Sequence, residues 1–490
     1  MKSYTMETKN GNRYLYSKNL KQFITSNSIL NTIVKEKDKG VGDDVIKSLL
    51  LQNSLESEID YYFDFYNFLK TNGFFNIENN SSTIRYKKDD LIQNISNVRQ
   101  VVFEVTDDCN LSCKYCGYGY FYNDYDNRAK AKLSFNKAKL LLDYIFSYHN
   151  TYNNNSLERE IAIGFYGGEP LLNMTLIKQI VSYIDSLNLE DLKIKYGMTT
   201  NGMLLDKNFE YLSEHNFSLL VSLDGDRRGS SYRVTNNGKE SFDKVFSNLK
   251  LIEKEAPSLF KTIRFNSVLH DRNSVASLFK FFKKEFGKDT KVSELSTIGI
   301  EPNKKDGFLS IFNSSLKSSE QANISCDDTF KYTLPETRLI SDLIFRDSNV
   351  SYQDYSSLLL EKKQVSTTGT CPPFLKRLFL SVSGKLLPCE KVDQRFAIGS
   401  VSKTAVNIDF EEVANSYNNM LEDLYSHTCV NCLKNDVCDV CVLHAYDQGN
   451  LNCSQQMSRS DFSSGMAKKI TCLERSPEML QIINNSVKIR

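Results

Sequence analysis

Three cysteines stand close together in the run Cys109-Asn-Leu-Ser-Cys113-Lys-Tyr-Cys116, which directly follows an apolar stretch at residues 101–105. A tetrahedral zinc ion or a cubane iron–sulfur cluster takes four protein thiolates when it is fully ligated. This loop supplies three, and the next cysteine along the chain is Cys326. Three ligands leave one metal position open, and an open position allows chemistry. The loop therefore favours a catalytic iron–sulfur site over a structural zinc loop.

A second group of cysteines lies near the end of the chain, where eight of the twelve cysteines fall between Cys371 and Cys472. Short spacings such as Cys429-Val-Asn-Cys432 are typical of metal binding. Disulfides are not expected, because no apolar signal segment opens the chain and thiols stay reduced in the cytosol. The spacing alone permits a pair of zinc ribbons as well as iron–sulfur clusters, and the open-site loop upstream favours iron.

Short polar motifs follow further strand-like segments of the chain. They are Phe165-Tyr166-Gly167-Gly168-Glu169-Pro170, Thr199-Thr200-Asn201-Gly202 and Ser222-Leu223-Asp224-Gly225. Glycine allows close backbone approach, a carboxylate accepts hydrogen bonds from an ammonium group, and small polar side chains can bind a ribose. Gly-Gly, Asn-Gly and Asp-Gly are also common turn pairs, so each motif taken alone fits a turn as well.

Strand-like and helix-like segments alternate from residue 99 onward. The strand-like runs are 101–106, 160–166, 192–199, 217–223, 261–269 and 292–300. Amphipathic segments of helix length between them are 134–148, 171–184, 206–215, 241–254 and 274–286. This alternation predicts a parallel sheet with crossover helices that is closed or nearly closed. Active sites of such folds gather at the carboxyl ends of the strands, where the cysteine loop and the polar motifs stand.

The regions on either side of this alternation differ in composition. Residues 1–98 contain no cysteine and combine an extended piece at 12–16 with a helix-like piece at 59–69, which predicts a small module of hairpin and helices. Residues 303–370 are partly rich in Ser, Asn and Lys, and they indicate a connector or insertion with a helix near 334–346.

The composition is that of an ordinary soluble globular protein, with 40% hydrophobic and 25% charged residues. The formal net charge of +1 gives no long-range attraction to nucleic acid or to an anionic membrane. No stretch reaches the roughly 18 apolar residues of a membrane-spanning helix. We therefore expect a cytoplasmic protein, with more than one domain because the chain has 490 residues.

The three-cysteine loop resembles the cluster-binding motif of the radical SAM enzymes, and Cys109, Cys113 and Cys116 match it residue by residue. The Gly-Gly-Glu-Pro run resembles the motif in which that family holds the amino group of S-adenosylmethionine (SAM). The resemblance implies a 4Fe–4S cluster whose fourth iron binds SAM, so that reductive cleavage of SAM gives a 5′-deoxyadenosyl radical. The residues that it implies for SAM binding are Tyr115, Gly167, Gly168, Glu169, Thr200, Asn201, Ser222, Asp224 and Arg233.

The cysteine-rich tail resembles the SPASM domain, which carries two auxiliary iron–sulfur clusters in peptide-modifying radical SAM enzymes. Two residues separate Cys438 from Cys441, where the family has three. The resemblance implies two sets of cluster ligands, and the first of them has only three cysteines. Cys472, Cys326 or a substrate group could complete that set. The implied sets are Cys371, Cys389 and Cys441 for the first cluster, and Cys429, Cys432, Cys438 and Cys453 for the second.

Glu390 directly follows Cys389. In anaerobic sulfatase maturases, which share this kind of tail, a carboxylate at this place accepts a proton from the substrate. The family carries Asp there, whereas this chain carries the longer Glu. The resemblance thus implies Glu390 as a candidate catalytic base.

The combined resemblance covers about residues 99–475 and implies an α/β fold with three functional parts and a connector. The parts are a small winged-helix-like, leader-peptide-recognition module at 1–98, a radical SAM core with a partial (β/α)6 TIM-like barrel at 99–302, a connector at 303–370, and a SPASM domain at 371–490. The lead module is included because maturases of ribosomally made peptides often begin with one.

The implied function is a radical SAM peptide maturase that forms a thioether or carbon–carbon crosslink in a ribosomally made precursor peptide. Its implied partners are the leader segment of that precursor and a flavodoxin- or ferredoxin-type electron donor. One alternative is an anaerobic sulfatase-maturating enzyme that makes formylglycine. Another, from a different class, is a non-catalytic metal-binding adaptor that recognises peptides.

Overall fold

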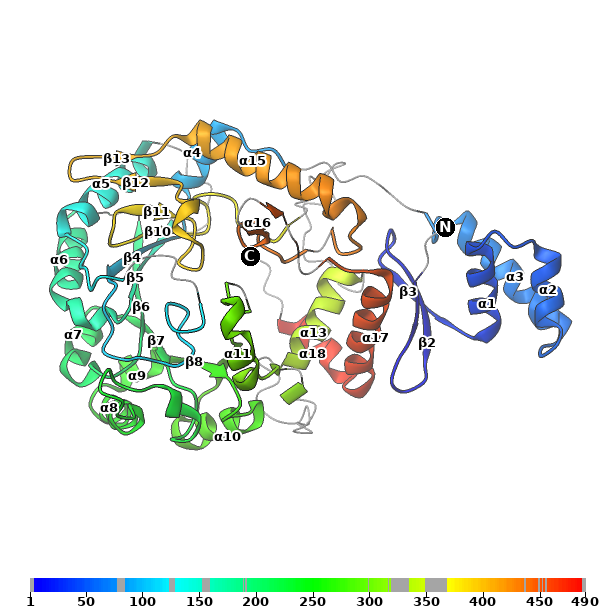
Figure 1. The fold of residues 1–490 in the computed structure, drawn as a ribbon, viewed down its shortest axis with the longest axis horizontal. Coiled ribbons are helices and arrows are strands. Elements are labelled where there is room, and N and C mark those ends of the chain that lie inside the picture. Colours follow the sequence, from blue (N-terminus) through cyan, green and yellow to red (C-terminus); the bar gives the residue numbers. More distant parts are fainter. Residues whose placement is uncertain are drawn as a thin grey trace.

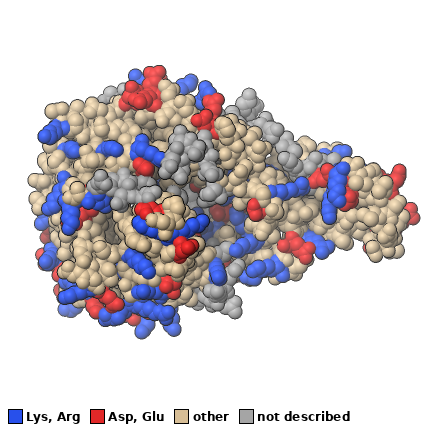
Figure 2. Space-filling model, viewed as in Figure 1, with Lys and Arg blue, Asp and Glu red and all other residues tan. Residues whose placement is uncertain are grey.

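The molecule consists of a large body, a separate N-terminal unit at the opposite end, and C-terminal helices between the two (Figure 1). Lys and Arg side chains are interspersed with Asp and Glu over the visible face (Figure 2), in agreement with the formal net charge of +1. This computed structural model describes residues 4–76, 84–122, 128–151, 159–187, 189, 192–297, 299–315, 317–318, 335–348, 368–435, 438–447, 450–451, 453 and 456–486.

The body is built on parallel strands that follow one another in the order β4-β5-β6-β7-β8-β9. They are β4 (Gln100–Thr106), β5 (Glu160–Gly167), β6 (Lys193–Thr200), β7 (Ser218–Ser222), β8 (Arg264–Leu269) and β9 (Thr290–Glu294). The helices between them are α5 (Phe135–Thr151), α6 (Met174–Asp185), α7 (Phe209–Glu214), α8 (Phe242–Glu255), α9 (Pro257–Thr262) and α10 (Val275–Phe286). Each predicted strand overlaps one of these strands, which confirms the predicted partial (β/α)6 barrel.

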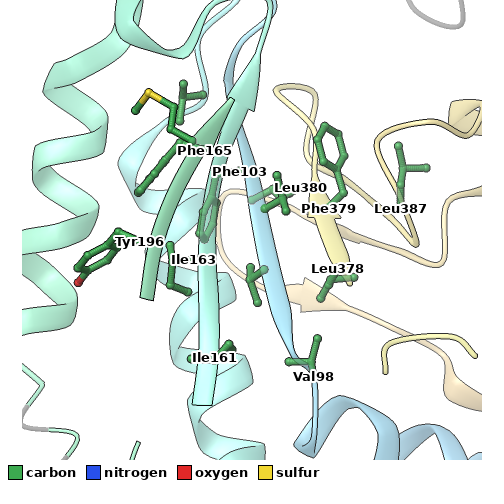
Figure 3. Packing of buried hydrophobic residues seen from close by; sticks show 14 of the residues in the cluster. Val98, Phe103, Ile161, Ile163, Phe165, Tyr196, Leu378, Phe379, Leu380 and Leu387 are labelled. Carbon is green, nitrogen blue, oxygen red and sulfur yellow. The ribbon is translucent and has the colours of Figure 1, made fainter. Parts of the chain in front are cut away.

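Apolar side chains between the strands and the helices form the main core. Every residue of β4 after Gln100 is buried, as expected for a parallel sheet that is covered on both faces. Phe103 and Phe165 stack with their ring centroids 6.4 Å apart. Figure 3 shows both rings with Ile163, where β4 and β5 lie side by side. The carboxyl ends of these strands are thereby fixed relative to one another.

The C-terminal region begins by adding strands to this sheet. Strand β10 (Leu378–Leu380) pairs parallel with β4, so that Leu378 lies opposite Val101. Figure 3 shows Leu378, Phe379 and Leu380 beside the β4 side chains. The antiparallel strands that continue the sheet outward are β11 (Lys385–Leu387), β12 (Gly399–Val401) and β13 (Val406–Asn407). The cysteine-rich region and the barrel therefore share one sheet.

The N-terminal unit combines an antiparallel sheet with helices, as predicted. Its elements are β1 (Tyr4–Glu7), β2 (Arg13–Ser17), β3 (Gln22–Ser26), α1 (Ser28–Asp38), α2 (Asp43–Leu50) and α3 (Glu56–Thr71). Leu15 packs with the helices on one face of the sheet. Tyr4 and Tyr16 pack on the other face against Phe462 and Met466 of α17 (Arg459–Arg475). The unit is thus anchored to the C-terminal helices.

The helix that precedes the boundary predicted at residue 98 packs against the barrel. Helix α4 (Lys88–Ser96) packs against α5 and α15 (Phe410–His427), and Leu91 and Ile95 belong to the core of the barrel. The apolar face of α4 packs on the barrel, a partner that an amphipathic pattern alone does not identify. The N-terminal unit therefore ends before α4.

The described part of the connector is helical. Helix α11 (Lys305–Ile311) packs on the segment that follows the cysteine loop, where Phe308 contacts Phe121 with ring centroids 5.9 Å apart. The helix predicted near 334–346 is confirmed as α13 (Pro335–Asp342) with a π-helical turn at Leu343–Asp347. Predictions for residues 319–334 and 349–367, Cys326 included, lie outside the described residues. The remaining elements are α16 (Val442–Ala445), β14 (Tyr446–Asp447), β15 (Asn450–Leu451) and α18 (Glu478–Ser486).

No helix in the described part of the chain is long and apolar enough to cross a membrane.

Candidate active site

The three-cysteine loop leaves the carboxyl end of β4 and is held by backbone hydrogen bonds to residues that follow β7. Ser112 N donates to the carbonyl oxygen of Val234 at 2.7 Å, and Lys114 N donates to that of Tyr232 at 3.1 Å. All three thiols are partly exposed, and each lies within electrostatic reach of another. The loop therefore holds three thiols in one neighbourhood.

Two N–H groups point at the sulfur of Cys109. Leu111 N lies 3.4 Å from Cys109 Sγ, and Asn201 Nδ2 lies 3.8 Å from it. The same Asn201 amide nitrogen donates to Asn110 Oδ1 at 2.7 Å, which fixes its orientation. Hydrogen bonds of this kind stabilise a thiolate and tune the potential of a cluster that the thiolate binds. Asn201 is thus placed beside a ligand sulfur.

Burial favours the protonated form of two of these thiols, those of Cys109 and Cys113, in the cluster-free protein. It raises the pKa of Cys109 to about 11 and that of Cys113 to about 12, although the Arg233 guanidinium acts against the rise at Cys113. A cysteine must lose its proton to bind iron, so cluster assembly at this loop releases protons.

The donor set of the loop fits an iron–sulfur cluster. Three neighbouring thiols, with N–H groups aimed at one of them, are what a cubane requires from the protein at three of its irons. Thiolates that share one zinc ion lie only about 4 Å apart, because each Zn–S bond is about 2.3 Å long. Among the described residues, no three His, Cys, Asp or Glu side chains meet closely enough to hold a single metal ion.

The Gly167-Gly168 pair brings β5 into contact with the start of the cysteine loop. A Cβ atom on Gly167 would lie 2.1 Å from the carbonyl oxygen of Thr106, and one on Gly168 would lie 2.1 Å from that of Asp108. Gly168 N donates to Thr106 O at 2.9 Å, and Glu169 N donates to Asp108 O at 2.8 Å. Both glycines are therefore needed for contact between two backbones, which sets where the cysteine loop begins.

The Glu169 carboxylate lies beneath the cysteine loop and is completely buried. It accepts hydrogen bonds from Leu171 N at 3.1 Å, Thr200 Oγ1 at 2.7 Å and Asn201 N at 2.7 Å. Burial raises the pKa of Glu169 to about 7, although these hydrogen bonds act against the rise. The structure thus brings Glu169, Thr200 and Asn201 together. The Glu169 carboxylate holds the backbone of Asn201, whose side chain points at Cys109.

A buried ion pair supports the other side of the loop. Arg233 donates to Asp224 through Nε at 2.9 Å and through Nη2 at 3.1 Å. Asp224 also accepts from the hydroxyl of Tyr115 and, at 2.8 Å, from Val268 N. Tyr115 in turn stacks on His270, with ring centroids 5.6 Å apart. The cysteine loop is therefore tied to the ends of β7 and β8 through the aromatic residue inside its motif.

The predicted SAM-binding residue Arg233 is engaged by Asp224, and Ser222 is half-buried at the end of β7. His270 follows β8 directly and is completely buried. Its position at a strand end is the signal that marks it as part of the same site.

A second polar group joins the loop to the C-terminal region. Tyr118 donates its hydroxyl to the carbonyl oxygen of Glu390 at 3.2 Å. Arg377 pairs with the Glu390 carboxylate, and Cys389 Sγ lies 3.3 Å from Glu390 Oε2. Burial disfavours the charged carboxylate, but Arg377 outweighs that effect and lowers the pKa of Glu390. Glu390 is therefore ionised at neutral pH, close to both cysteine regions.

Glu104 and Arg128 extend this group inside the barrel, and the sequence reasoning missed both. Arg128 Nη2 donates to Glu104 Oε1 at 3.2 Å, and its guanidinium lies 3.3 Å from the centre of the Tyr118 ring. Val382 N donates to Glu104 Oε2 at 3.1 Å, which links β4 to the turn after β10. A carboxylate within the otherwise apolar strand β4 was the available signal.

The structure gathers the cysteines of the second predicted auxiliary set. All four line one cavity of about 360 Å³ near the end of α15. The other three are electrostatic neighbours of the most buried one, Cys429. Four thiols around one cavity fit the donor set of a fully ligated cluster. These residues are Cys429, Cys432, Cys438 and Cys453.

The structure also gathers the first set but leaves Cys472 apart. Cys371, Cys389 and Cys441 are all electrostatic neighbours of Tyr417. Cys472 belongs to α17, and its side chain packs in an apolar cluster with Ile340 and other side chains of α13 and α18. Metal ligation by Cys472 therefore stays a prediction, and the helix places its side chain in that apolar contact.

The barrel and its cysteine loop define a class of protein. Residues 103–263 match the model of the Radical SAM superfamily. The chain therefore carries a radical SAM domain, which implies SAM and a 4Fe–4S cluster as cofactors and confirms the resemblance drawn from the cysteine motif.

The proteins that are similar to the chain include two curated relatives and one solved structure. It is 28% identical over 197 residues to a cysteine-type anaerobic sulfatase-maturating enzyme of Clostridium novyi (strain NT), which covers 39% of this chain and 49% of the relative. It is 27% identical over 227 residues to the radical SAM cyclopropyl synthase TigE of Paramaledivibacter caminithermalis, which covers 44% of each. The chain spans about half the length of these relatives.

The solved structure is native anSMEcpe with bound AdoMet and Cp18Cys peptide, with a TM-score of 0.54 at 18% identity. The match covers 79% of this chain and 99% of that chain, so the two share a fold. About a fifth of this chain has no counterpart in that structure.

Proposed function

We propose that this protein is a radical SAM maturase that installs a thioether or carbon–carbon crosslink in a ribosomally made precursor peptide. The observation that carries the proposal is the hydrogen bond from Tyr118, in the open-site cysteine loop, to Glu390 beside Cys389. It places a loop suited to an open cluster next to a second set of cysteines. A peptide bound between them can lose a hydrogen on one side and pass an electron to the other.

Each part of the site has a role in this proposal. The loop cysteines hold the cluster, and when bound the cluster supplies the electron that cleaves SAM to a 5′-deoxyadenosyl radical, which takes hydrogen from the peptide. Asn201 points toward Cys109, and Glu169 accepts hydrogen bonds from Asn201 N and from Thr200. These residues would hold the amino group of SAM. Asp224 and Arg233 hold Tyr115 on the other side of the loop.

The C-terminal cysteine sets serve as auxiliary clusters that take up the surplus electron. A flavodoxin- or ferredoxin-type protein returns electrons to the open-site cluster. Glu390 is the proposed proton acceptor, because its carboxylate is ionised and its partner Arg377 balances the charge before the proton arrives.

The N-terminal unit is the proposed binding site for the leader segment. Strand β3 lies at the end of its sheet, so one edge of β3 is unpaired among the described strands. Large apolar side chains are exposed on and beside the neighbouring helices, with Leu55 69%, Tyr61 63% and Phe68 61% exposed. An extended peptide uses such features, adding a strand to the free edge and placing apolar side chains against exposed ones.

Binding of a labelled leader peptide to a Tyr61→Ser/Phe68→Ser variant tests the unit. Point variants are preferable to deletion of the unit, because deletion would expose the apolar face of α17 that the sheet covers. Loss of two aromatic contacts predicts at least about tenfold weaker binding. Leu251→Ser, a change at an exposed apolar residue of the barrel, is the control. Equal affinity of the double variant and the wild type would reject the assignment.

Mass spectrometry of a co-expressed precursor tests the reaction. A crosslink removes two hydrogens, a loss of about 2 Da, and blocks fragmentation between the joined residues. The second candidate is formylglycine formation, favoured by the similarity to sulfatase-maturating enzymes. Its product from a Cys residue is about 18 Da lighter and reacts with hydrazides. That product would replace the crosslinking proposal.

A further inference from the structure

The loop that follows Cys432 contacts the N-terminal sheet directly. Leu433 packs against an apolar cluster that contains Tyr16 of β2. Two residues further along, Asn435 Oδ1 accepts a hydrogen bond of 2.9 Å from the Nζ of Lys18, which stands directly after β2. One apolar and one polar contact therefore join this loop of the second auxiliary set to the hairpin formed by β2 and β3.

Met457 joins the cysteine cavity to the same apolar cluster. It lines the cavity of about 360 Å³ that the four cysteines of the second set also line, and it packs against the cluster around Tyr16. Helix α17 begins two residues after Met457 and lies beside the N-terminal sheet (Figure 1). The Phe462 ring of α17 lies 4.9 Å from the Tyr4 ring, between centroids. At Met457, therefore, a single side chain separates the cysteine cavity from the cluster that the N-terminal sheet completes.

Polar groups connect the same hairpin to Cys438. The carboxylate of Asp439, directly after that cysteine, lies 4.0 Å from the guanidinium of Arg346. The carbonyl oxygen of Arg346 accepts a hydrogen bond of 3.0 Å from the Nζ of Lys21, the last residue before β3. Lys18 and Lys21, at the two ends of the hairpin turn, are therefore connected to the second cysteine set by separate contacts.

The strand to which the leader is proposed to bind takes part in these contacts. Phe23 of β3 stacks on Tyr16, with ring centroids 4.6 Å apart, and packs against the same apolar cluster as Leu433. Every residue of β3 is paired with a residue of β2. A shift of β2 at the cysteine loop is therefore transmitted to β3.

We propose that the second auxiliary set has a further function: when it is loaded, its loop supports the β2–β3 hairpin and thereby strengthens leader binding at β3. This inference rests on the proposed function, because it presupposes that the leader binds at β3. Four thiolates held by one cluster restrict the loop between them, since the free energy of metal binding becomes folding energy. A hairpin whose support is already ordered loses less entropy when a strand is added to it.

Hydrogen–deuterium exchange of the full-length chain tests the support in the absence of any leader. The amides of β2 and β3 are compared between the anaerobically reconstituted protein and its cluster-free form, and both forms are also prepared with Lys18→Met. This change removes the hydrogen bond to Asn435 and leaves every cysteine in place. Lys70→Met, at an exposed residue of α3, is the matched control.

The proposal predicts that these amides exchange at least about fivefold more slowly in the loaded protein, the factor that one hydrogen bond contributes. Lys18→Met should remove part of this protection and should change little in the cluster-free protein, whereas Lys70→Met should change neither form. Equal exchange in the loaded and cluster-free proteins would overturn the proposal. An equal effect of Lys18→Met in both forms would also overturn it, because the bond would then be independent of the cysteine set.

Two cysteine variants assign the protection to one set. It should persist without the first set, in Cys371→Ala/Cys389→Ala/Cys441→Ala, and disappear without the second, in Cys429→Ala/Cys432→Ala/Cys438→Ala/Cys453→Ala. Protection that is kept without the second set would overturn the proposal. If the second variant fails to fold, which fast exchange in α3 would reveal, the comparison with Lys18→Met decides.

Leader affinity separates this inference from the proposed function. The probe is the labelled leader segment of the co-expressed precursor, and its equilibrium binding to the same variants is measured. The protein without the second set should bind it at least about fivefold more weakly than the parent, and the protein without the first set should bind it equally well. A parent that does not bind the probe would reject the leader site and this inference with it. Equal binding by the parent and by the protein without the second set would reject only the support by the cysteine loop.

Discussion

Tyr118 and Glu390 join two regions that are 272 residues apart, through a hydrogen bond of 3.2 Å from the tyrosine hydroxyl to the glutamate carbonyl. Tyr118 lies two residues after Cys116, and Glu390 directly follows Cys389. The bond therefore holds the open-site loop against the first auxiliary set. The distance between the two cysteine sites depends on it.

Tyr118→Phe tests this coupling. The variant should bind the same amount of iron and cleave SAM at the wild-type rate, because no ligand is lost. Peptide modification should slow by up to about tenfold, since a hydrogen bond of this kind contributes about 1 kcal/mol. Tyr120→Phe, at an exposed tyrosine of the same loop, is the control. If the rates of peptide modification and SAM cleavage fell equally, Tyr118 would support the cysteine loop itself and not the contact between the two cysteine regions.

The buried Glu169 predicts a pH-dependent stability. Its pKa is about 7 in the folded protein and about 4.5 in the unfolded chain, so the folded state holds a proton that the unfolded state releases in this range. The stability from Glu169 is complete below pH 4.5 and is lost as pH rises to about 7, by about 3 kcal/mol.

Urea unfolding of the cluster-free protein at pH 5 and pH 8 measures this effect. Glu169→Gln should remove about 3 kcal/mol from the difference in unfolding free energy between the two pH values. Glu214→Gln, at an exposed residue of α7, should leave the difference unchanged. A Glu169→Gln variant with the full wild-type pH dependence would show that Glu169 ionises normally.

The ion pair of Asp224 and Arg233 predicts a large loss of stability when one partner is removed. Asp224→Asn leaves a buried guanidinium without its countercharge, and such changes cost about 3–5 kcal/mol. Asp243→Asn, in the exposed pair with Arg227, should cost about 1 kcal/mol or less. Denaturant unfolding of the two variants makes the comparison. Similar losses in both would mean that the buried pair is dispensable.

Gly168→Ala should disrupt the start of the cysteine loop. Its Cβ would lie 2.1 Å from the carbonyl oxygen of Asp108, so the two backbones must separate. We expect about four fewer irons per chain after reconstitution, corresponding to the open-site cluster alone. Gly465→Ala, where the new Cβ meets nothing within 4 Å, should retain all iron. Normal iron content in Gly168→Ala would show that close contact at this glycine is not needed for cluster binding.

The barrel was predictable because its signals are local. Each strand is a short apolar run, and each ends in a polar or glycine-rich motif such as that at Gly167. The grouping of Glu169 with Asn201 also followed, since the carboxyl ends of neighbouring parallel strands meet at one edge.

The rest depended on contacts between distant residues. Strand β10 has only the residues Leu378–Leu380, too few for a periodic pattern, and its pairing with β4 spans most of the chain. The contact of Tyr118 with Glu390 could not be read from the sequence, because tyrosine is frequent and Tyr118 belongs to no motif. The packing of Cys472 in an apolar cluster was also not predictable, because cysteine spacing does not reveal the direction in which a helix turns a side chain.

Iron content and SAM cleavage in the anaerobically reconstituted full-length protein test the central claim most directly. The account predicts about twelve irons per chain, a brown chromophore and release of 5′-deoxyadenosine upon reduction in the presence of SAM. Cys109→Ala should lose about four irons and all cleavage. A colourless protein that contains zinc and leaves SAM intact would contradict the account and favour a non-catalytic metal-binding adaptor.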